Sequence, residues 1–94
     1  MKPQKTKDLD TLFKKKGFLP QERDHTYYLL YYKNKKTSVF TKISHGLREY
    51  GDKLLSQMAK ELSLTNSEFE DLVGCPLTYD KLIEKLIERN RISY

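Results

Sequence analysis

The sequence has a single cysteine and no long apolar run, and these two features exclude several classes of protein. Cys75 cannot form a disulfide within the chain, and no other Cys or His lies near it at the spacing of metal ligands. No apolar stretch approaches the roughly 20 residues needed to cross a bilayer. The opening residues, MKPQKTK, lack the apolar core of a secretion signal. We therefore expect a cytoplasmic protein without membrane contact, in which Cys75 is a small buried or half-buried thiol.

The sequence also lacks the short motifs of several enzyme classes. It contains no glycine-rich phosphate loop, no His-Glu-x-x-His pair, no Cys-x-x-Cys pair and no nucleophile elbow. A dense carboxylate cluster that could hold two metal ions is missing as well. This pattern argues against most metal-dependent nucleases, and we expect neither a cofactor nor a metal site.

Positive charge is abundant, and most of it lies in one part of the chain. The net charge of the 94 residues is +5. Residues 1–60 hold 14 Lys and Arg against 6 Asp and Glu, whereas residues 61–94 hold 4 against 7. A positive field of this kind would attract a polyanion such as RNA. A lysine-rich surface that only keeps a small protein soluble is an equally good explanation.

Local patterns predict a single domain over residues 1–94. A main helix is expected before and after three β-rich runs, with a Thr65–Glu68 capping box and two short helices at the end. The predicted elements are a helix at 6–16, strands near 21–23, at 26–33 and at 37–43, and helices at 50–62, at 66–72 and after Thr78. A three-stranded antiparallel sheet with both main helices on one face is an α+β sandwich, and this order is that of the double-stranded-RNA-binding fold.

The last predicted helix has two interpretations. Its apolar positions form one stripe, consisting of Leu82, Ile83, Leu86 and Ile87. The stripe either completes the domain's own core, which we consider the better interpretation, or forms an exposed seam for a partner or a second copy. The sequence leaves the oligomeric state open.

A histidine stands at the mouth of the most strand-like segment, RDHTYYLLYY at residues 23–32. Alternation along a strand would put His25, Tyr27, Leu29 and Tyr31 on one face and Thr26, Tyr28, Leu30 and Tyr32 on the other. Because neither set is plainly polar, we expect a central strand with helices on one face and aromatic rings available on the other. An imidazole at its end, in the basic half of the chain, could exchange protons with RNA.

Three stretches resemble a known family. In order, they are DHTYY after KKKGF, then TSVFTKISHG, then LLSQMAKELSLTNSEFEDLV, and together they resemble the HicA-type toxins of prokaryotic toxin–antitoxin pairs. The resemblance spans residues 8–73, within a HicA-like core at 6–73 that is followed by a helical extension at 74–94. It implies a double-stranded-RNA-binding-like fold, endoribonuclease activity on mRNA without an obligatory metal, and silencing by a HicB-type antitoxin. His25 matches the family's catalytic histidine, although Arg23-Asp24 stands where the family has Gly-Ser.

The residues suggest a division of labour for such a reaction. We hypothesise that His25 is the general base or acid of a transesterification at phosphorus, and that Asp24 could orient its ring. His45 is the candidate second proton carrier, or else a residue that simply ends its strand. Lysines would hold the backbone and stabilise developing charge, and tyrosines would either stack on unpaired bases or form plain sheet surface. The predicted RNA-binding residues are Arg23, Lys33, Lys35, Lys36, Lys42, Tyr28 and Tyr32.

Two other functions remain open from the sequence alone. One is a non-catalytic RNA-binding module on the same fold, with His25 as a structural hydrogen-bonding residue. The other is a protein-interaction domain that uses the C-terminal helix.

Overall fold

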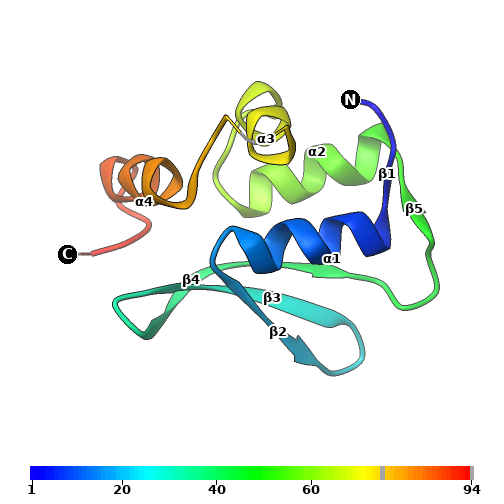
Figure 1. Cartoon of the computed structure of the whole chain (residues 1–94), viewed down its shortest axis with the longest axis horizontal. Coiled ribbons are helices and arrows are strands. Elements are labelled where there is room, and N and C mark those ends of the chain that lie inside the picture. The colour runs from blue at the N-terminus through cyan, green and yellow to red at the C-terminus, as the bar shows by residue number, and fades with distance from the viewer. Residues whose placement is uncertain (75, 94) are drawn as a thin grey trace.

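The aromatic run forms β3 (Thr26–Tyr32), the central strand of a three-stranded antiparallel sheet with the order β2-β3-β4. The computed structural model describes residues 1–74 and 76–93, so Cys75 and Tyr94 lie outside the described residues. The described residues form an α+β domain with four helices (Figure 1). The other elements are β1 (Gln4–Lys5), α1 (Thr6–Lys15), β2 (Phe18–Glu22), β4 (Lys35–Ile43), β5 (Glu49–Tyr50), α2 (Asp52–Glu61), α3 (Asn66–Val73) and α4 (Tyr79–Glu88).

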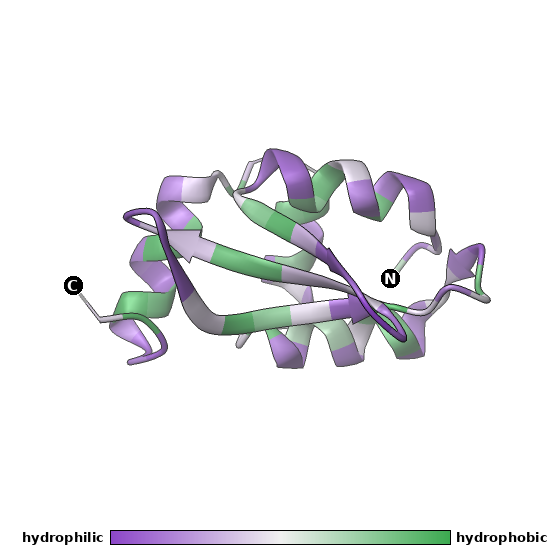
Figure 2. Cartoon of the chain, turned by 90° about the horizontal axis from the view of Figure 1, so that it is seen from below, coloured by the Kyte–Doolittle hydropathy of each residue, from purple (hydrophilic) through white to green (hydrophobic). Residues whose placement is uncertain are grey.

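Both main helices cover the same face of the sheet, as the sequence predicted. In Figure 1 the sheet forms the lower layer and α1 and α2 lie above it. Side chains from the two layers meet in a continuous apolar core, which includes Leu9 and Phe13 of α1, Leu30 of β3 and Leu55 of α2. Figure 2 views the sheet from below, and no helix covers the strands on that side. One face of the sheet is therefore buried and the other is bare.

Two features of the strands differ from the prediction. β2 begins at Phe18 rather than near residue 21, because Phe18 is buried in the core and pairs with Leu30. Pro20 lies within this strand, which is at the edge of the sheet, where a missing backbone N–H is tolerated. The second difference is a small two-stranded sheet of β1 and β5, whose two-residue strands are too short to leave a period-2 pattern.

Turn and cap residues mark the ends of several elements, and the predicted capping box is confirmed. Gly17 ends α1 with a φ of 89°, and Asn34 has a φ of 62° in the tight turn between β3 and β4, the β3–β4 turn. The capping box at α3 is complete, since the Thr65 hydroxyl accepts from the Glu68 backbone N–H and the Glu68 carboxylate accepts from the Thr65 backbone N–H. At α4 the cap is Thr78, whose hydroxyl accepts from the Lys81 backbone N–H.

Helix α4 completes the core, so the preferred interpretation of its apolar stripe is confirmed. Leu82, Ile83 and Leu86 are all buried. Tyr79 fixes the start of the helix, because its hydroxyl donates to the Tyr31 carbonyl at 2.7 Å. None of the helices described for this chain has the length and apolar character to cross a membrane.

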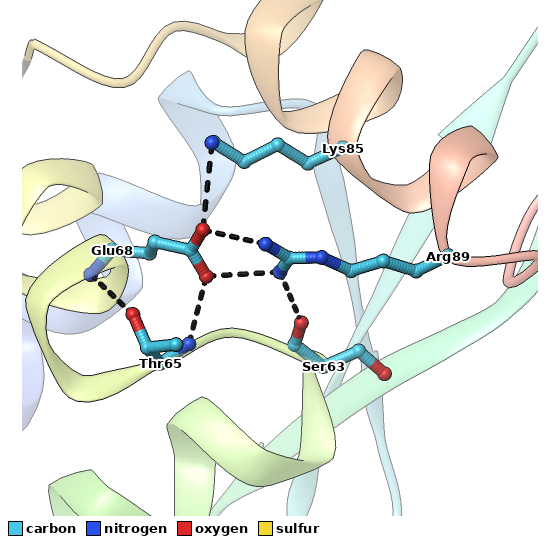
Figure 3. Close-up of polar contacts among 5 residues, drawn as sticks. All are labelled: Ser63, Thr65, Glu68, Lys85 and Arg89. Carbon is cyan, nitrogen blue, oxygen red and sulfur yellow. Dashed lines mark hydrogen bonds and ion pairs between the residues drawn. The ribbon is translucent and has the colours of Figure 1, made fainter.

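A charged cluster joins α3 to the end of α4 (Figure 3). Arg89 donates to both carboxylate oxygens of Glu68, at 2.9 and 2.6 Å, and to the Ser63 carbonyl at 2.6 Å. Lys85 lies 3.4 Å from the same carboxylate. The hydrogen bonds from Arg89, followed by that from the Thr65 backbone, lower the pKa of Glu68 to about 2 despite its partial burial. The cluster thus fixes the chain just after α4.

Candidate functional site

The bare face of the sheet carries apolar and aromatic side chains in rows across the three strands. One row pairs Leu19 of β2 with Leu29 of β3 and Phe40 of β4, and Leu19 and Phe40 are 52% and 44% exposed. The next row pairs Gln21 with Tyr27 and Lys42. The rings of Tyr27 and Phe40 lie 6.0 Å apart between centroids. Flat rings in such positions can stack on nucleic-acid bases.

His25 lies at one end of this face, in the loop that joins β2 to β3. The Arg23 backbone N–H donates to the His25 carbonyl at 2.9 Å, which closes the loop. The His25 ring lies 6.3 Å from the Tyr27 ring, and the Arg23 guanidinium carbon lies 6.0 Å from the centre of the same ring. The imidazole of His25 and the guanidinium of Arg23 therefore both lie beside the Tyr27 ring.

The environment of the imidazole leaves one of its nitrogens for a ligand. Nδ1 of His25 is enclosed and has no hydrogen-bond partner among the described residues. The Asp24 carboxylate accepts from the His25 backbone N–H at 3.1 Å, so it bonds to the main chain and not to the ring. A substrate would therefore have to meet the opposite edge of the ring, which carries Nε2.

His45 lies at the same end of the sheet and is held by polar side chains. Its Nε2 is 3.1 Å from Glu22 Oε2 and 3.1 Å from the Thr26 hydroxyl oxygen. The Thr26 hydroxyl donates in turn to the other Glu22 oxygen at 2.8 Å. Thr26 pairs with Ile43, which is buried beneath the helices, so His45 contacts the side of the sheet opposite to Tyr27. The two histidines share one end of the sheet but not one face.

The predicted lysines do not converge on His25. Lys42 pairs with Tyr27, near the histidines. Lys33, Lys35 and Lys36 lie at the β3–β4 turn, at the far end of β3, which is about 20 Å away at roughly 3.3 Å per residue. At that distance these three lysines cannot stabilise charge that develops beside His25. Of the predicted basic residues, Arg23 and Lys42 remain in position to do so.

One predicted stacking residue is buried. Tyr28 is 2% exposed, and its hydroxyl donates to Asp10 of α1 at 2.5 Å, so its ring cannot receive a base on the surface. Burial, followed by the bond to Asp10, raises the pKa of the Tyr28 hydroxyl. Burial disfavours the charged Asp10, but the hydrogen bonds from Tyr28 and Lys14 outweigh it and lower the pKa of Asp10. Tyr28 is thus a core residue.

The second predicted stacking residue, Tyr32, lies at the β3–β4 turn. Its half-buried ring packs against the core, and the Lys33 ammonium is 5.3 Å from the ring centre. The distance along β3 separates it from His25. If Tyr32 stacks on a base, it does so at the other end of the sheet.

The sequence did not indicate three residues that the structure adds to these surfaces. Tyr27, which is half-buried on the bare face, replaces Tyr28 as the accessible ring, and nothing in the pattern of the run distinguishes the two. Glu22 contacts His45, and its pairing with Thr26 follows only from the β2–β3 register. Arg91 lines the same groove as the lysines of the β3–β4 turn, because the segment after α4 folds back towards that turn.

The chemistry available at the His25 end is proton exchange beside a flat ring and two cations. The described part of the chain has no group of three or more His, Cys, Asp or Glu side chains placed to hold a metal ion. No protein-family model, no curated protein and no solved structure matches this chain.

Proposed function

We propose that this chain is an RNA-binding endoribonuclease, the toxin of a toxin–antitoxin pair, which cleaves mRNA by metal-independent histidine chemistry. The observation that supports this proposal best is the position of His25 beside the half-buried Tyr27 ring on the bare face, with Arg23 and Lys42 nearby. Stacking holds a base, the cations hold the adjacent phosphate, and the imidazole exchanges the proton. These are the minimum groups for cleavage of RNA by its own 2′-hydroxyl.

In the proposed reaction, His25 accepts the proton of a 2′-hydroxyl. The 2′-oxygen forms a bond to the adjacent phosphorus, and the bond from phosphorus to the 5′-oxygen breaks. The leaving 5′-oxygen takes a proton from water, because the His45 ring contacts the opposite side of the sheet. The products are a 2′,3′-cyclic phosphate and a 5′-hydroxyl, and Arg23 and Lys42 offset the charge that develops on the phosphate.

The proposed scaffold is the double-stranded-RNA-binding-like fold. It is supported by the chain order, in which three antiparallel strands follow α1 and precede α2, and by the packing of both helices on the same face of the sheet. The proposed partner of the toxin is a HicB-type antitoxin in the cytoplasm, in keeping with the resemblance of residues 8–73 to HicA-type toxins.

The test is the rate of cleavage of a single-stranded RNA by purified protein, with the product ends identified. His25→Ala should lower the rate about 10²- to 10⁴-fold, the range expected for loss of a general acid or base. Lys60→Ala, which removes an exposed charge on α2, serves as the control and should cleave at the parent rate. Equal rates for His25→Ala and the parent protein would refute the enzyme proposal.

A non-catalytic RNA-binding module is the second candidate. The separation of Lys33, Lys35 and Lys36 from both histidines favours it, because binding at the β3–β4 turn needs no imidazole. RNA binding by a parent protein that leaves the RNA intact would select this function. The third possibility, interaction through the apolar stripe of α4, lacks support because that stripe is buried in the chain's own core.

A further inference from the structure

A basic groove lies at the β3–β4 turn, about 20 Å from His25 along the strand. Its volume is about 450 Å³, within the range of sites that hold small organic ligands. The β-hairpin forms one wall, and the segment after α4 forms the other. The side chains that give the groove its charge are Lys33, Lys35, Lys36 and Arg91, and the Tyr32 ring lies among them.

The C-terminal wall is built by specific contacts. Asn90 has a φ of 59°, which turns the chain after α4, and the Arg91 backbone N–H donates to the Leu86 carbonyl at 2.8 Å. The Arg91 guanidinium donates to the Ser63 hydroxyl, which is a neutral partner. Arg89, one residue before this turn, is fixed by Glu68 (Figure 3). Arg91 is therefore held beside the hairpin.

The groove has the chemistry of a phosphate site. Its lining includes four cationic side chains, and no acidic side chain of the described residues lines it. The Ser93 hydroxyl adds a hydrogen-bond donor, which a phosphate oxygen can accept, whereas the Thr37 hydroxyl already donates to the Leu30 carbonyl at 2.7 Å. The Tyr32 ring at the same place suits a nucleotide better than free phosphate, since it offers a surface on which a base can stack.

We infer that this groove, completed by Arg91 and the C-terminal segment, is a second binding site for the backbone of single-stranded RNA. The inference rests on the proposed function. It adds a preference for substrate length, because only a sufficiently long RNA can reach from the groove to His25. Single-stranded nucleic-acid sites on OB folds, which are domains of comparable size, hold roughly 4–16 nucleotides. An RNA of about 12 nucleotides can occupy both sites, whereas one of about 3 nucleotides can occupy only one.

The test compares binding of labelled oligouridines of about 12 and about 3 nucleotides by fluorescence anisotropy. A His25→Ala background prevents cleavage during the measurement. The groove variant is Lys35→Gln/Lys36→Gln/Arg91→Gln, in which the new amide at position 91 can still donate to Ser63. We expect the longer RNA to lose affinity at least about tenfold relative to the shorter one. The slope of log affinity against log salt should become shallower by about 2, because three cations no longer neutralise phosphates.

The matched control is Lys53→Gln/Lys60→Gln/Lys81→Gln, which removes three exposed charges outside the groove. It should keep the preference for the longer RNA within about twofold, so a loss as large as that of the groove variant would refute a local site. Circular dichroism and thermal unfolding of both triple variants check that the fold is retained.

The test separates this inference from the proposed function. Cleavage by the parent protein with an unchanged length preference in the groove variant overturns the inference alone. A lost length preference in a protein that never cleaves RNA supports the groove and refutes the enzyme. Absence of RNA binding by the parent protein overturns both.

Discussion

The two ends of the three-stranded sheet differ in the sign and arrangement of their charges. At the β3–β4 turn the groove has four cations and no acidic side chain among the described residues. At the histidine end, Glu22 and Asp24 stand among Arg23, Lys42 and two imidazoles. Charge of one sign attracts phosphate, whereas acids beside imidazoles can orient the rings and take part in proton transfer. Binding and chemistry are therefore expected at different ends of the sheet.

The largest effect expected from this comparison is that variants at the two ends change different kinetic constants. His25→Ala should lower kcat by about 10²- to 10⁴-fold, because it removes a proton carrier. Loss of Lys35 and Lys36 should instead appear mainly as a rise in KM of about tenfold, because these residues act on binding. Steady-state kinetics on a long single-stranded RNA distinguish the two. A change in kcat as large for the double lysine variant as for His25→Ala would contradict the separation.

The turn end depends on how α4 docks, and Gly17 is the residue most sensitive to that docking. Its φ of 89° is unfavourable for any residue with a Cβ, and a Cβ at this position would lie 2.4 Å from the Tyr79 ring. Gly17→Ala should therefore lower the free energy of unfolding by about 2–4 kcal/mol. Urea denaturation measures it. Gly46→Ala is the control, because nothing lies within 4 Å of a Cβ there, and its effect should stay below about 0.5 kcal/mol.

How far the sequence predicts this molecule depends on how local the interaction is. The capping box at Thr65 and Glu68 follows from a few neighbouring residues, and it is confirmed. The half-buried Tyr27 and the buried Tyr28 of β3 could not be distinguished, since both tyrosines have apolar or aromatic neighbours on either side. Their faces are set by the helices that pack against Tyr28.

The sequence predicted individual residues of the candidate site but not which of them lie close together. His25 and Lys33 are eight positions apart in the sequence, and an extended strand converts that short separation into opposite ends of a sheet. The contact of Glu22 with His45 and the approach of Arg91 to the hairpin join residues far apart in the chain. The register and the docking of α4 decide such contacts. The roles of His25 and His45 in cleavage stay predictions.

The charged cluster at Glu68 is expected to have a smaller effect than Gly17 and to depend on pH. Glu68 has a folded-state pKa of about 2, below the ordinary 4.5, so its contribution to stability is complete above about pH 4.5. That contribution is lost as the pH falls from 4.5 towards 2. Glu68→Gln should lower the free energy of unfolding at neutral pH by about 1–3 kcal/mol, because it removes charge-assisted hydrogen bonds.

Denaturation between about pH 7 and pH 2 measures the contribution of Glu68, with Glu84→Gln on the exposed side of α4 as the control. The Glu68→Gln protein should lose less stability on acidification than the parent, and the control should follow the parent. Because Glu68 fixes Arg89, the variant should also weaken binding of the longer oligouridine through the displaced C-terminal wall. Unaltered acid sensitivity of Glu68→Gln would show that the cluster does not hold α4 in place.

The smallest effects separate the two neighbouring tyrosines at the histidine end. Tyr27→Ala should weaken RNA binding by about 1–3 kcal/mol through the loss of stacking. Tyr28→Phe should leave RNA binding unchanged and lower the free energy of unfolding by about 1 kcal/mol, because the hydrogen bond to Asp10 is lost.

The stability of the parent protein should also fall as the pH rises above about 10, partly through Tyr28. Burial and the bond to Asp10 raise the pKa of the folded-state hydroxyl above its unfolded value of 10.0, so the folded state resists deprotonation and its advantage is lost in alkali. Tyr28→Phe should reduce this alkaline loss, as measured by urea denaturation between about pH 8 and pH 11. Weaker RNA binding by Tyr28→Phe than by Tyr27→Ala would mean that the RNA approaches the helix-covered side, and the bare face would no longer be the site.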